Sequence, residues 1–314
     1  MANGLSTRKM MEHPNIPGRF HVNCSLIKDG ERSMVEAEGY VELPNQVKIS
    51  YFEKGTAAGI PIILLHGLAD SWHIFELLSH FLPKSLHVYA LTQRGHGNSS
   101  RPDSGYATRD FEEDLVMFMD ALNIENAVIL GASSGGFPAR SFAINHSDRT
   151  LALVLLGSPA TLQGIPAVKK IWDSAITKMA DPVDRKFVED FAMSTLSQPV
   201  TQEFLEMILR ENLKVSAKVW RDTTEHMLQE QFPGELNKIN TPTLIIWGDQ
   251  DKLLSRESQE ELARVIPGSK LVVHQNVGHL LYCEDPEGVA SDIAVFIDDN
   301  LSKKRKVAAE KGPE

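Results

Sequence analysis

The sequence predicts an α/β fold with a mainly parallel central sheet, helices on both faces of that sheet and an inserted block of helices. Short, continuous apolar segments alternate with segments of helical periodicity along most of the chain. Uninterrupted apolar segments are typical of strands that are buried on both faces of a parallel sheet. The alternation stops between about residues 159 and 240, where only helical patterns occur. We therefore expect one α/β core that is interrupted by a helical insertion.

The expected elements follow in chain order from residue 35. Residues 35–51 alternate apolar and polar side chains around a turn at Pro44 and Asn45, which indicates an antiparallel hairpin. Later apolar segments predict strands over residues 60–65, 86–91, 127–130, 151–156, 243–247 and 271–273. Helical periodicity between them predicts helices over residues 72–81, 110–122 and 137–146.

Helical periodicity in the inserted segment predicts four further helices, over residues 167–179, 184–195, 201–213 and 216–229. We divide the chain accordingly into a few parts. They are an N-terminal extension (1–34), an α/β core (35–158 and 241–301), a helical cap (159–240) and a polar tail (302–314). Because the insertion separates two strands of one sheet, the cap is expected to lie over an end of that sheet.

The most informative motif lies between the expected strand 127–130 and the expected helix 137–146. Residues 131–135 read Gly-Ala-Ser-Ser-Gly. This fits Gly-x-Ser-x-Gly, a sharp turn that presents a nucleophilic serine at the end of a strand. The turn strains the backbone, so the neighbouring positions must be nearly free of side chain, and glycine meets this need. Ser133 is therefore the candidate nucleophile.

A serine hydroxyl is a weak nucleophile at neutral pH and needs a base, which a carboxylate in turn orients. Two later strand ends offer these groups. Asp251 lies just beyond the strand 243–247, and His279 lies on a loop beyond the strand 271–273. Ligands gather beyond the carboxyl ends of strands in open α/β sheets, so we expect these side chains to meet Ser133 there. The spacing leaves Asp249 open as an alternative acid.

Taken together, these motifs resemble the α/β-hydrolase superfamily, in the branch that carries a serine triad and a helical cap. The resemblance runs from about residue 40 to about residue 301. Residues 62–68 (Ile-Ile-Leu-Leu-His-Gly-Leu) are similar to the family's strand and oxyanion loop, and residues 241–248 are similar to the strand before its acid. Residues 91–99 are similar to its Asp-x-Arg-Gly-x-Gly-x-Ser segment, except that Gln93 replaces the usual Asp. We interpret Gln93 as a local structural variation, because this is not a triad position.

The resemblance implies the catalytic order Ser133, Asp251, His279, and it favours Asp251 over Asp249 as the acid. It also implies an oxyanion hole made of the backbone N–H groups of Leu68 and Ser134. Losing one donor of an oxyanion hole typically lowers kcat by roughly 10²- to 10³-fold.

A cap above the triad is expected to shape an apolar pocket and to exclude water. The candidate substrate-binding residues are apolar side chains of the cap and of the segment after the oxyanion loop: Trp72, Trp172, Ile176, Met207 and Trp220, with Met179, Phe191 and Met227 as further candidates. Each has an alternative interpretation, because apolar residues at helical spacing usually pack a helix onto its neighbours. Trp72 and His73 would pack equally well against the sheet edge. The cap holds no clear charged cluster, which favours an apolar or neutral substrate.

The composition excludes several classes of function. The chain has 314 residues and a formal net charge of −10, which argues against general nucleic-acid binding. The two cysteines, Cys24 and Cys283, are too few and too far apart for a disulfide framework or a zinc site. The sequence contains neither His-Glu-x-x-His nor a Gly-rich phosphate loop followed by Lys. We therefore expect no metal and no cofactor.

The chain ends carry few targeting signals. Residues 1–17 are polar and lack the apolar core of a secretory signal, and no segment approaches 18 consecutive apolar residues. We expect a cytoplasmic protein without a membrane span. The basic run 303–307 has two interpretations, a solvated helix end or a short nuclear-import signal, of which we favour the first. The oligomeric state is open.

The leading functional hypothesis is a serine hydrolase that cleaves a carboxylic ester or a lactone without a cofactor. Relatives that open epoxides or remove halides use an aspartate nucleophile, and Ser133 argues against both. Carbon–carbon bond hydrolases and perhydrolases keep the serine triad, so they remain alternatives. A small-molecule receptor built on the same fold is a third interpretation.

Overall fold

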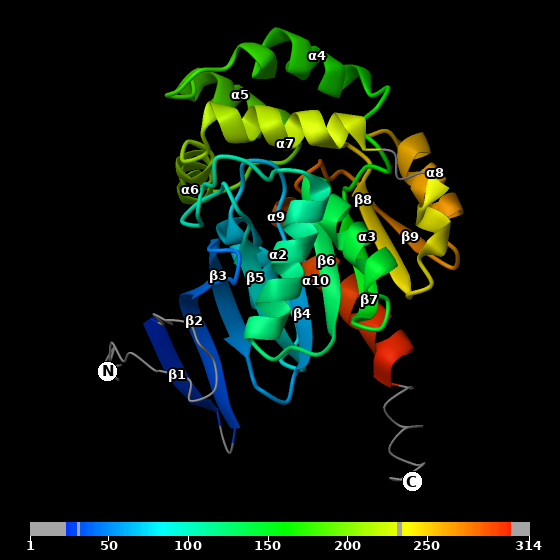
Figure 1. The fold of residues 1–314 in the computed structure, drawn as a ribbon. Helices are drawn as coiled ribbons and strands as arrows, with labels where there is room; N and C mark the ends of the chain where they lie inside the picture. The colour runs from blue at the N-terminus through cyan, green and yellow to red at the C-terminus, as the bar shows by residue number, and fades with distance from the viewer. Residues whose placement is uncertain (1–22, 30–31, 231–233, 303–314) are drawn as a thin grey trace.

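The computed structural model describes residues 23–29, 32–230 and 234–302 and confirms the predicted α/β architecture (Figure 1). Across the described residues, nine strands form one sheet in the order β1-β2-β3-β5-β4-β6-β7-β8-β9. In chain order these strands are β1 (Asn23–Asp29), β2 (Arg32–Glu42), β3 (Lys48–Gly55), β4 (Ile60–Leu65), β5 (Leu86–Thr92), β6 (Ala127–Ala132), β7 (Thr150–Leu156), β8 (Thr243–Gly248) and β9 (Lys270–His274). The strands from β5 to β9 in this order pair in parallel, whereas β1, β2 and β3 pair antiparallel.

Helices cover both faces of the sheet, as Figure 1 shows for α2 and α3 on one side and α10 on the other. The α-helices are α1 (Glu76–Phe81), α2 (Thr108–Ala121), α3 (Gly136–Asn145), α4 (Pro166–Ser174), α5 (Arg185–Thr195), α6 (Gln202–Asn212), α7 (Ala217–Gln229), α8 (Arg256–Val265), α9 (Leu281–Glu284) and α10 (Pro286–Ile297). Alternate residues of each central strand enter different cores. In β4, Ile62 and Leu64 pack into the core that contains α10, while Ile63 packs into the core under α2 and α3. Burial on both faces explains why the strands read as continuous apolar segments.

The insertion folds as predicted into helices α4 to α7, which lie across one end of the sheet (Figure 1). Three of these helices begin next to residues that the sequence marks as caps. The side chains of Asp184, Thr201 and Ser216 accept hydrogen bonds from backbone N–H groups of the first helical turn. Such caps satisfy N–H groups that the helix itself leaves unpaired, which fixes where each helix starts. The first expected helix of the insertion is split into α4 and a short 3-10 helix, η3 (Ile176–Lys178).

The sheet extends further toward the N-terminus than the expected start of the core at residue 35. β1 pairs with β2 from Asn23↔Glu38 to Asp29↔Arg32, so this part of the expected N-terminal extension belongs to the sheet. An edge strand is held mainly by backbone hydrogen bonds to one neighbour, and it therefore needs no continuous apolar segment. The rest of the expected extension and the basic run 303–307 lie outside the described residues.

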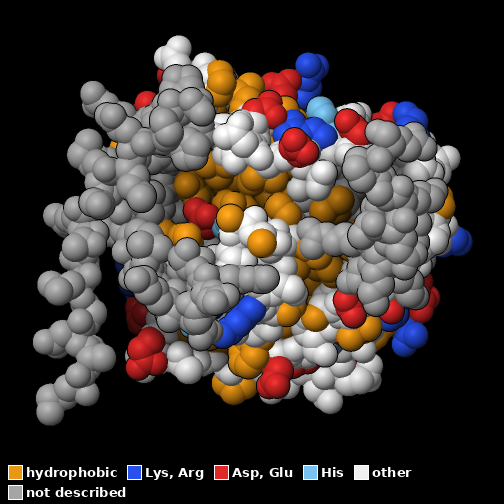
Figure 2. Space-filling view, turned by 90° about the horizontal axis from the view of Figure 1, so that it is seen from below, with side chains coloured by type: hydrophobic (Ala, Val, Ile, Leu, Met, Phe, Trp, Pro, Cys, Tyr) orange, Lys and Arg blue, Asp and Glu red, His pale blue; other side chains and the backbone are white. Residues whose placement is uncertain are grey.

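The face seen in Figure 2 bears mixed side chains around an apolar centre. Lys and Arg side chains of the described residues are scattered there among acidic ones and form no basic patch on that face. No helix within the described ranges has both the length and the apolar character that a membrane crossing requires.

Candidate active site

Ser133 occupies a strained turn directly after β6. Its φ angle is +51°, in the left-handed region that residues with a Cβ rarely adopt. The turn is closed so tightly that a Cβ on Gly131 would lie 2.5 Å from the carbonyl oxygen of Gly135. A Cβ on Gly135 would overlap with the carbonyl oxygen of Leu65 at the end of β4. Because Gly131 and Gly135 have no side chains, the turn passes close to the end of β4, and the Ser133 hydroxyl projects from the turn.

The structure brings the three predicted triad residues into one chain of hydrogen bonds. His279 Nε2 lies 2.9 Å from Ser133 Oγ, and His279 Nδ1 lies 2.8 Å from Asp251 Oδ2. The other carboxylate oxygen of Asp251 accepts the backbone N–H groups of Leu253 at 2.8 Å and Leu254 at 3.0 Å. The Asp251 side chain is fully buried, so its charge acts on His279 without screening by solvent.

Asp249, the alternative acid, lies in the same loop but points elsewhere. Its Oδ1 accepts the backbone N–H of Asn276 at 2.6 Å, and its backbone N–H donates to the carbonyl oxygen of His274. Asp249 therefore braces the loop after β8 against the loop after β9.

The loop that carries His279 is tied to the inserted helices. The backbone N–H of His279 donates to the carbonyl oxygen of Thr195, at the end of α5, over 3.0 Å. Glu284 accepts hydrogen bonds from the backbone N–H of Gly278 at 2.9 Å and from the N–H and hydroxyl of Ser197 at 2.9 and 2.8 Å. Because these contacts connect the end of α5 to the histidine loop, the position of the base depends on the packing of the insertion.

Two buried side chains fix the predicted oxyanion loop. His66 Nδ1 lies 2.7 Å from the carbonyl oxygen of Gly67, and His66 Nε2 accepts the backbone N–H of Gln93 at 2.9 Å. The Gln93 side chain donates to the carbonyl oxygen of His66 at 2.8 Å. Burial and the neighbouring His96 hold the pKa of His66 well below its usual value, so the ring is neutral. The carbonyl of Gly67 shares a planar peptide with the N–H of Leu68, so holding one group orients the other.

An apolar pocket of about 80 Å³ opens beside Ser133, Leu68, Ser134 and His279. On the same measure a single water molecule needs about 10–15 Å³, so the pocket has room for a short chain. The pocket walls are apolar side chains of the insertion and of the loop after β8, chiefly Leu162, Ile171, Ile176, Phe191, Met227 and Leu254. The pocket therefore suits an apolar group bonded to a carbonyl at Ser133.

Of Trp72, Trp172, Ile176, Met207 and Trp220, the first five candidates for substrate binding, only Ile176 lies in the lining of this pocket. Trp72 instead stacks on Phe52 of β3, with ring centroids 4.7 Å apart, and belongs to the core. Trp220 is fully buried behind the pocket and packs edge-on against Phe191 at 5.2 Å.

Trp172 and Met207 are likewise absent from the lining of this pocket. Successive residues of an α-helix point about 100° apart, and in both cases an adjacent residue faces a cavity. Ile171 lines the apolar pocket in place of Trp172, and Ile208 borders a neighbouring cavity in place of Met207. Helical periodicity found the buried stripe but did not determine which of its residues face substrate.

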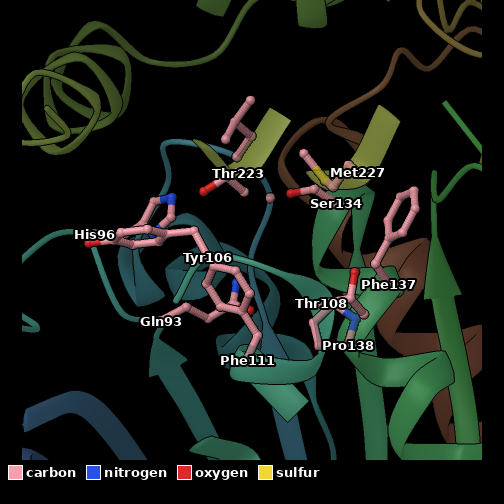
Figure 3. A pocket seen from close by; sticks show the side chains of 12 residues that line it. Gln93, His96, Tyr106, Thr108, Phe111, Ser134, Phe137, Pro138, Thr223 and Met227 are labelled. Carbon is pink, nitrogen blue, oxygen red and sulfur yellow. The ribbon is translucent and has the colours of Figure 1, made fainter. Parts of the chain in front are cut away.

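A smaller hollow lies behind the oxyanion loop (Figure 3). It encloses about 20 Å³ and is lined by Gly67, Leu68 and Ser134 among others. Figure 3 shows Thr223 and Met227 above it, His96 and Tyr106 to one side, and Thr108 and Phe137 to the other. His96 Nε2, Thr108 Oγ1 and Thr223 Oγ1 have no hydrogen-bond partner among the described residues. At this size the hollow holds only about one water molecule, so it is too small for a substrate chain.

Sequence reasoning missed several polar residues near Ser133. Asp70, Asn212 and Tyr282 line a cavity beside the nucleophile. Asp70 was detectable in principle, because it is a carboxylate only four residues after His66 of the oxyanion loop. Asn212 and Tyr282 carry no comparable signal in the sequence. Among the described residues, no group of three or more His, Cys, Asp or Glu side chains is arranged to hold a metal ion.

The pKa of His279 predicts the acid limb of a pH–rate profile. Burial lowers this pKa, but the charge of Asp251, its hydrogen bond, and the charges of Asp70 and Glu284 together raise it above the ordinary value of 6.5. A general base must be unprotonated, so kcat/KM is expected to rise with pH and to reach half its maximum above pH 6.5. Measuring kcat/KM for p-nitrophenyl butyrate across the neutral range tests this prediction. A midpoint below the ordinary histidine value would contradict it.

Comparison with known proteins gives the following matches. A family model described as "alpha/beta hydrolase fold" matches residues 60–286. The AB hydrolase superfamily protein YisY of Bacillus subtilis (strain 168) is 29% identical over 255 residues, which covers 79% of this chain and 95% of YisY. Lipase 3 of Moraxella sp. (strain TA144) is 25% identical over 324 residues, which covers 94% of this chain and 96% of the lipase. The crystal structure of the enol-lactonase from Burkholderia xenovorans LB400 superposes with a TM-score of 0.71 at 20% identity, covering 82% of this chain and 99% of that chain.

Proposed function

The chain belongs to the α/β-hydrolase fold family, and we propose that it is a serine hydrolase that cleaves a carboxylic ester or a lactone of a largely apolar small molecule. The observation that carries this proposal is the hydrogen-bond chain from Asp251 through His279 to Ser133, which ends beside an apolar pocket. The likeness to Lipase 3 agrees with ester hydrolysis.

In the first half of the proposed reaction, Ser133 Oγ attacks the ester carbonyl while His279 Nε2 takes the hydroxyl proton. The backbone N–H groups of Leu68 and Ser134 stabilise the oxyanion of the tetrahedral intermediate. The carbon–oxygen bond of the ester then breaks, and His279 returns the proton to the leaving alkoxide. The products of this half are the free alcohol and an acyl group bonded to Ser133.

In the second half, His279 takes a proton from water, and the resulting nucleophile attacks the acyl-enzyme. Collapse of the second tetrahedral intermediate releases the carboxylic acid and returns the proton to Ser133. Asp251 stays ionised throughout and stabilises the protonated form of His279. We assign the acyl chain to the pocket bordered by Ile176, Phe191 and Met227, with helices α4 to α7 acting as the cap.

The acyl-enzyme is the intermediate that an experiment can detect. Mixing the protein with excess p-nitrophenyl butyrate is expected to release a burst of p-nitrophenol, followed by steady turnover. Rapid acid quenching and peptide mass analysis are expected to find one butyryl group on the peptide that contains Ser133. A parallel panel of short lactones would show whether the cap also admits cyclic esters.

The same experiment separates the proposal from its alternatives. A carbon–carbon bond hydrolase or a perhydrolase uses the same triad, but esters would not be its preferred substrates. We therefore expect either enzyme to be acylated slowly and to turn over esters poorly. A receptor on this fold would bind ligands with little turnover. Absence of both the burst and the adduct, in a protein whose melting curve is cooperative, would reject ester hydrolysis as the function.

A further inference from the structure

A second compartment adjoins Ser133, and several buried polar side chains stand in its otherwise largely apolar wall. It encloses about 40 Å³ and shares Leu68, Ser133, Phe191, Leu253 and His279 with the apolar pocket. Its remaining walls include Asp70, Asn212 and Tyr282. The nucleophile is therefore bordered by an apolar pocket and by a smaller compartment with buried polar groups, which suits a substrate that has one apolar and one polar end.

Asp70 is a buried carboxyl group with spare hydrogen-bonding capacity. Only 8% of the residue is exposed, and its Oδ1 accepts a hydrogen bond from Asn212 Nδ2 at 3.1 Å. Among the described residues, none donates to Oδ2. Asp70 Oδ2 and Ser133 Cβ both lie 3.2 Å from the position that a Cβ on Gly67 would occupy, so both border the same space. Burial raises the pKa of Asp70 to about 7, against the opposing effects of Asn212 and His279.

Tyr282 supplies a second group without a partner. Its side chain is fully buried, and its hydroxyl has no hydrogen-bond partner among the described residues. Leaving a buried hydroxyl unpaired is costly, so such groups are normally satisfied within the protein, by water or by a ligand. Burial and the charge of Asp70 hold the pKa of Tyr282 well above its usual value, which keeps the phenol neutral and able to donate.

The polar groups come from three separate parts of the chain. Asp70 follows the oxyanion loop, Asn212 ends α6 in the insertion, and Tyr282 belongs to α9 after the histidine loop. They converge at one compartment beside the nucleophile. Asn212 also donates to the carbonyl oxygen of Ala69 at 3.0 Å, which fixes the amide so that it holds Asp70 in place.

We propose that this compartment binds hydroxyl groups on the alcohol side of the ester, so that the preferred substrates are esters of an apolar acid with a short polyol. This inference rests on the proposed ester hydrolysis and names its substrate class. A hydroxyl of the polyol donates to Asp70 Oδ2 and accepts from the Tyr282 hydroxyl, while the acyl chain enters the apolar pocket. After cleavage, the released polyol carries the proton that His279 delivers.

The test compares two esters that share an acyl chain and differ only in alcohol hydroxyls. These are glycerol monobutyrate and propyl butyrate, assayed with the full chain at about pH 8. Because the two added hydrogen bonds form in a buried site, the wild-type protein is expected to favour the glycerol ester in kcat/KM by roughly tenfold or more. Tyr282→Phe is expected to reduce this ratio by roughly fivefold to tenfold, and Asp70→Asn to reduce it similarly.

Tyr89→Phe is the matched control, because it removes the hydroxyl of another buried tyrosine that contacts His87 and lies outside the compartment. It is expected to leave the ratio unchanged. The polyol site is rejected, while ester hydrolysis stands, if the wild-type protein has the same kcat/KM for both esters. It is also rejected if Tyr282→Phe and Asp70→Asn change kcat/KM for both esters by the same factor. If the wild-type protein hydrolyses neither ester and its time course of product release equals that of Ser133→Ala, the proposed function and the polyol site are both rejected.

Discussion

Replacing Ser133 with alanine is expected to lower kcat for p-nitrophenyl butyrate by about 10⁶-fold, the order of loss found when a serine protease loses its nucleophile. The loss is large because Ser133 Oγ is the atom that bonds to the substrate and the one that His279 Nε2 reaches at 2.9 Å. The oxyanion donors and the pocket remain, so a residual rate above that of water alone is expected. Single-turnover assays with stopped-flow detection measure this change.

The stability of two Ser133 variants provides the control. Alanine keeps the strain of a Cβ at φ +51°, whereas glycine has no Cβ and adopts this angle freely. Ser133→Gly is therefore expected to be as inactive as Ser133→Ala. Its free energy of unfolding, measured in urea, is expected to exceed that of Ser133→Ala by about 1 kcal/mol. Both variants must unfold cooperatively for the activity result to be interpreted. Full activity in the alanine variant would show that another residue attacks the ester.

The parallel sheet and the positions of the three triad candidates could be predicted from sequence because both depend on strand ends. Each candidate follows a continuous apolar segment, and parallel strands bring their carboxyl ends to one edge. Ser133 follows β6, Asp251 follows β8 and His279 follows β9, so the sheet order alone places them near one another. The positive φ of Ser133 agrees with the strain that the flanking glycines predicted.

The pocket walls could not be predicted in the same way. Helical periodicity defines a buried stripe of about 100° or more around the helix, but it does not say whether a residue faces the core or a cavity. Trp220 and Ile176 are both buried residues of the insertion, yet only Ile176 reaches the apolar pocket. The difference depends on how α7 and η3 rotate against the sheet, which is set by tertiary packing.

The compartment around Asp70 shows a second limit. Asp70, Asn212 and Tyr282 together span more than two hundred positions of the chain and follow no motif of fixed spacing. Their convergence depends on how the insertion packs against the histidine loop. Glu284 and the carbonyl oxygen of Thr195 accept the hydrogen bonds that join these two parts. Convergence of this kind is visible only once the helices are placed in space.

The identity of the acid gives the second large expected effect. Asp251→Asn is expected to lower kcat by roughly 10³- to 10⁴-fold, similar to the loss when the triad carboxylate of a serine protease becomes an amide. Asp249→Asn is expected to change kcat by less than about threefold, because its Oδ1 can still accept the backbone N–H of Asn276. Steady-state kinetics of the two variants, purified in parallel, test both expectations.

The hydrogen bonds around Asp251 explain why an amide of the same shape is so damaging. Two backbone N–H groups, those of Leu253 and Leu254, donate to Oδ1, so the amide oxygen of an asparagine would take that position. Its NH₂ group would then face His279 Nδ1, which would have to accept a hydrogen bond instead of donating one. The ring proton would move to Nε2, and His279 could no longer take the proton of Ser133. If Asp249→Asn proved the more damaging change, the acid would have to be reassigned to Asp249, and the observed contact between Asp251 and His279 would need to rearrange during catalysis.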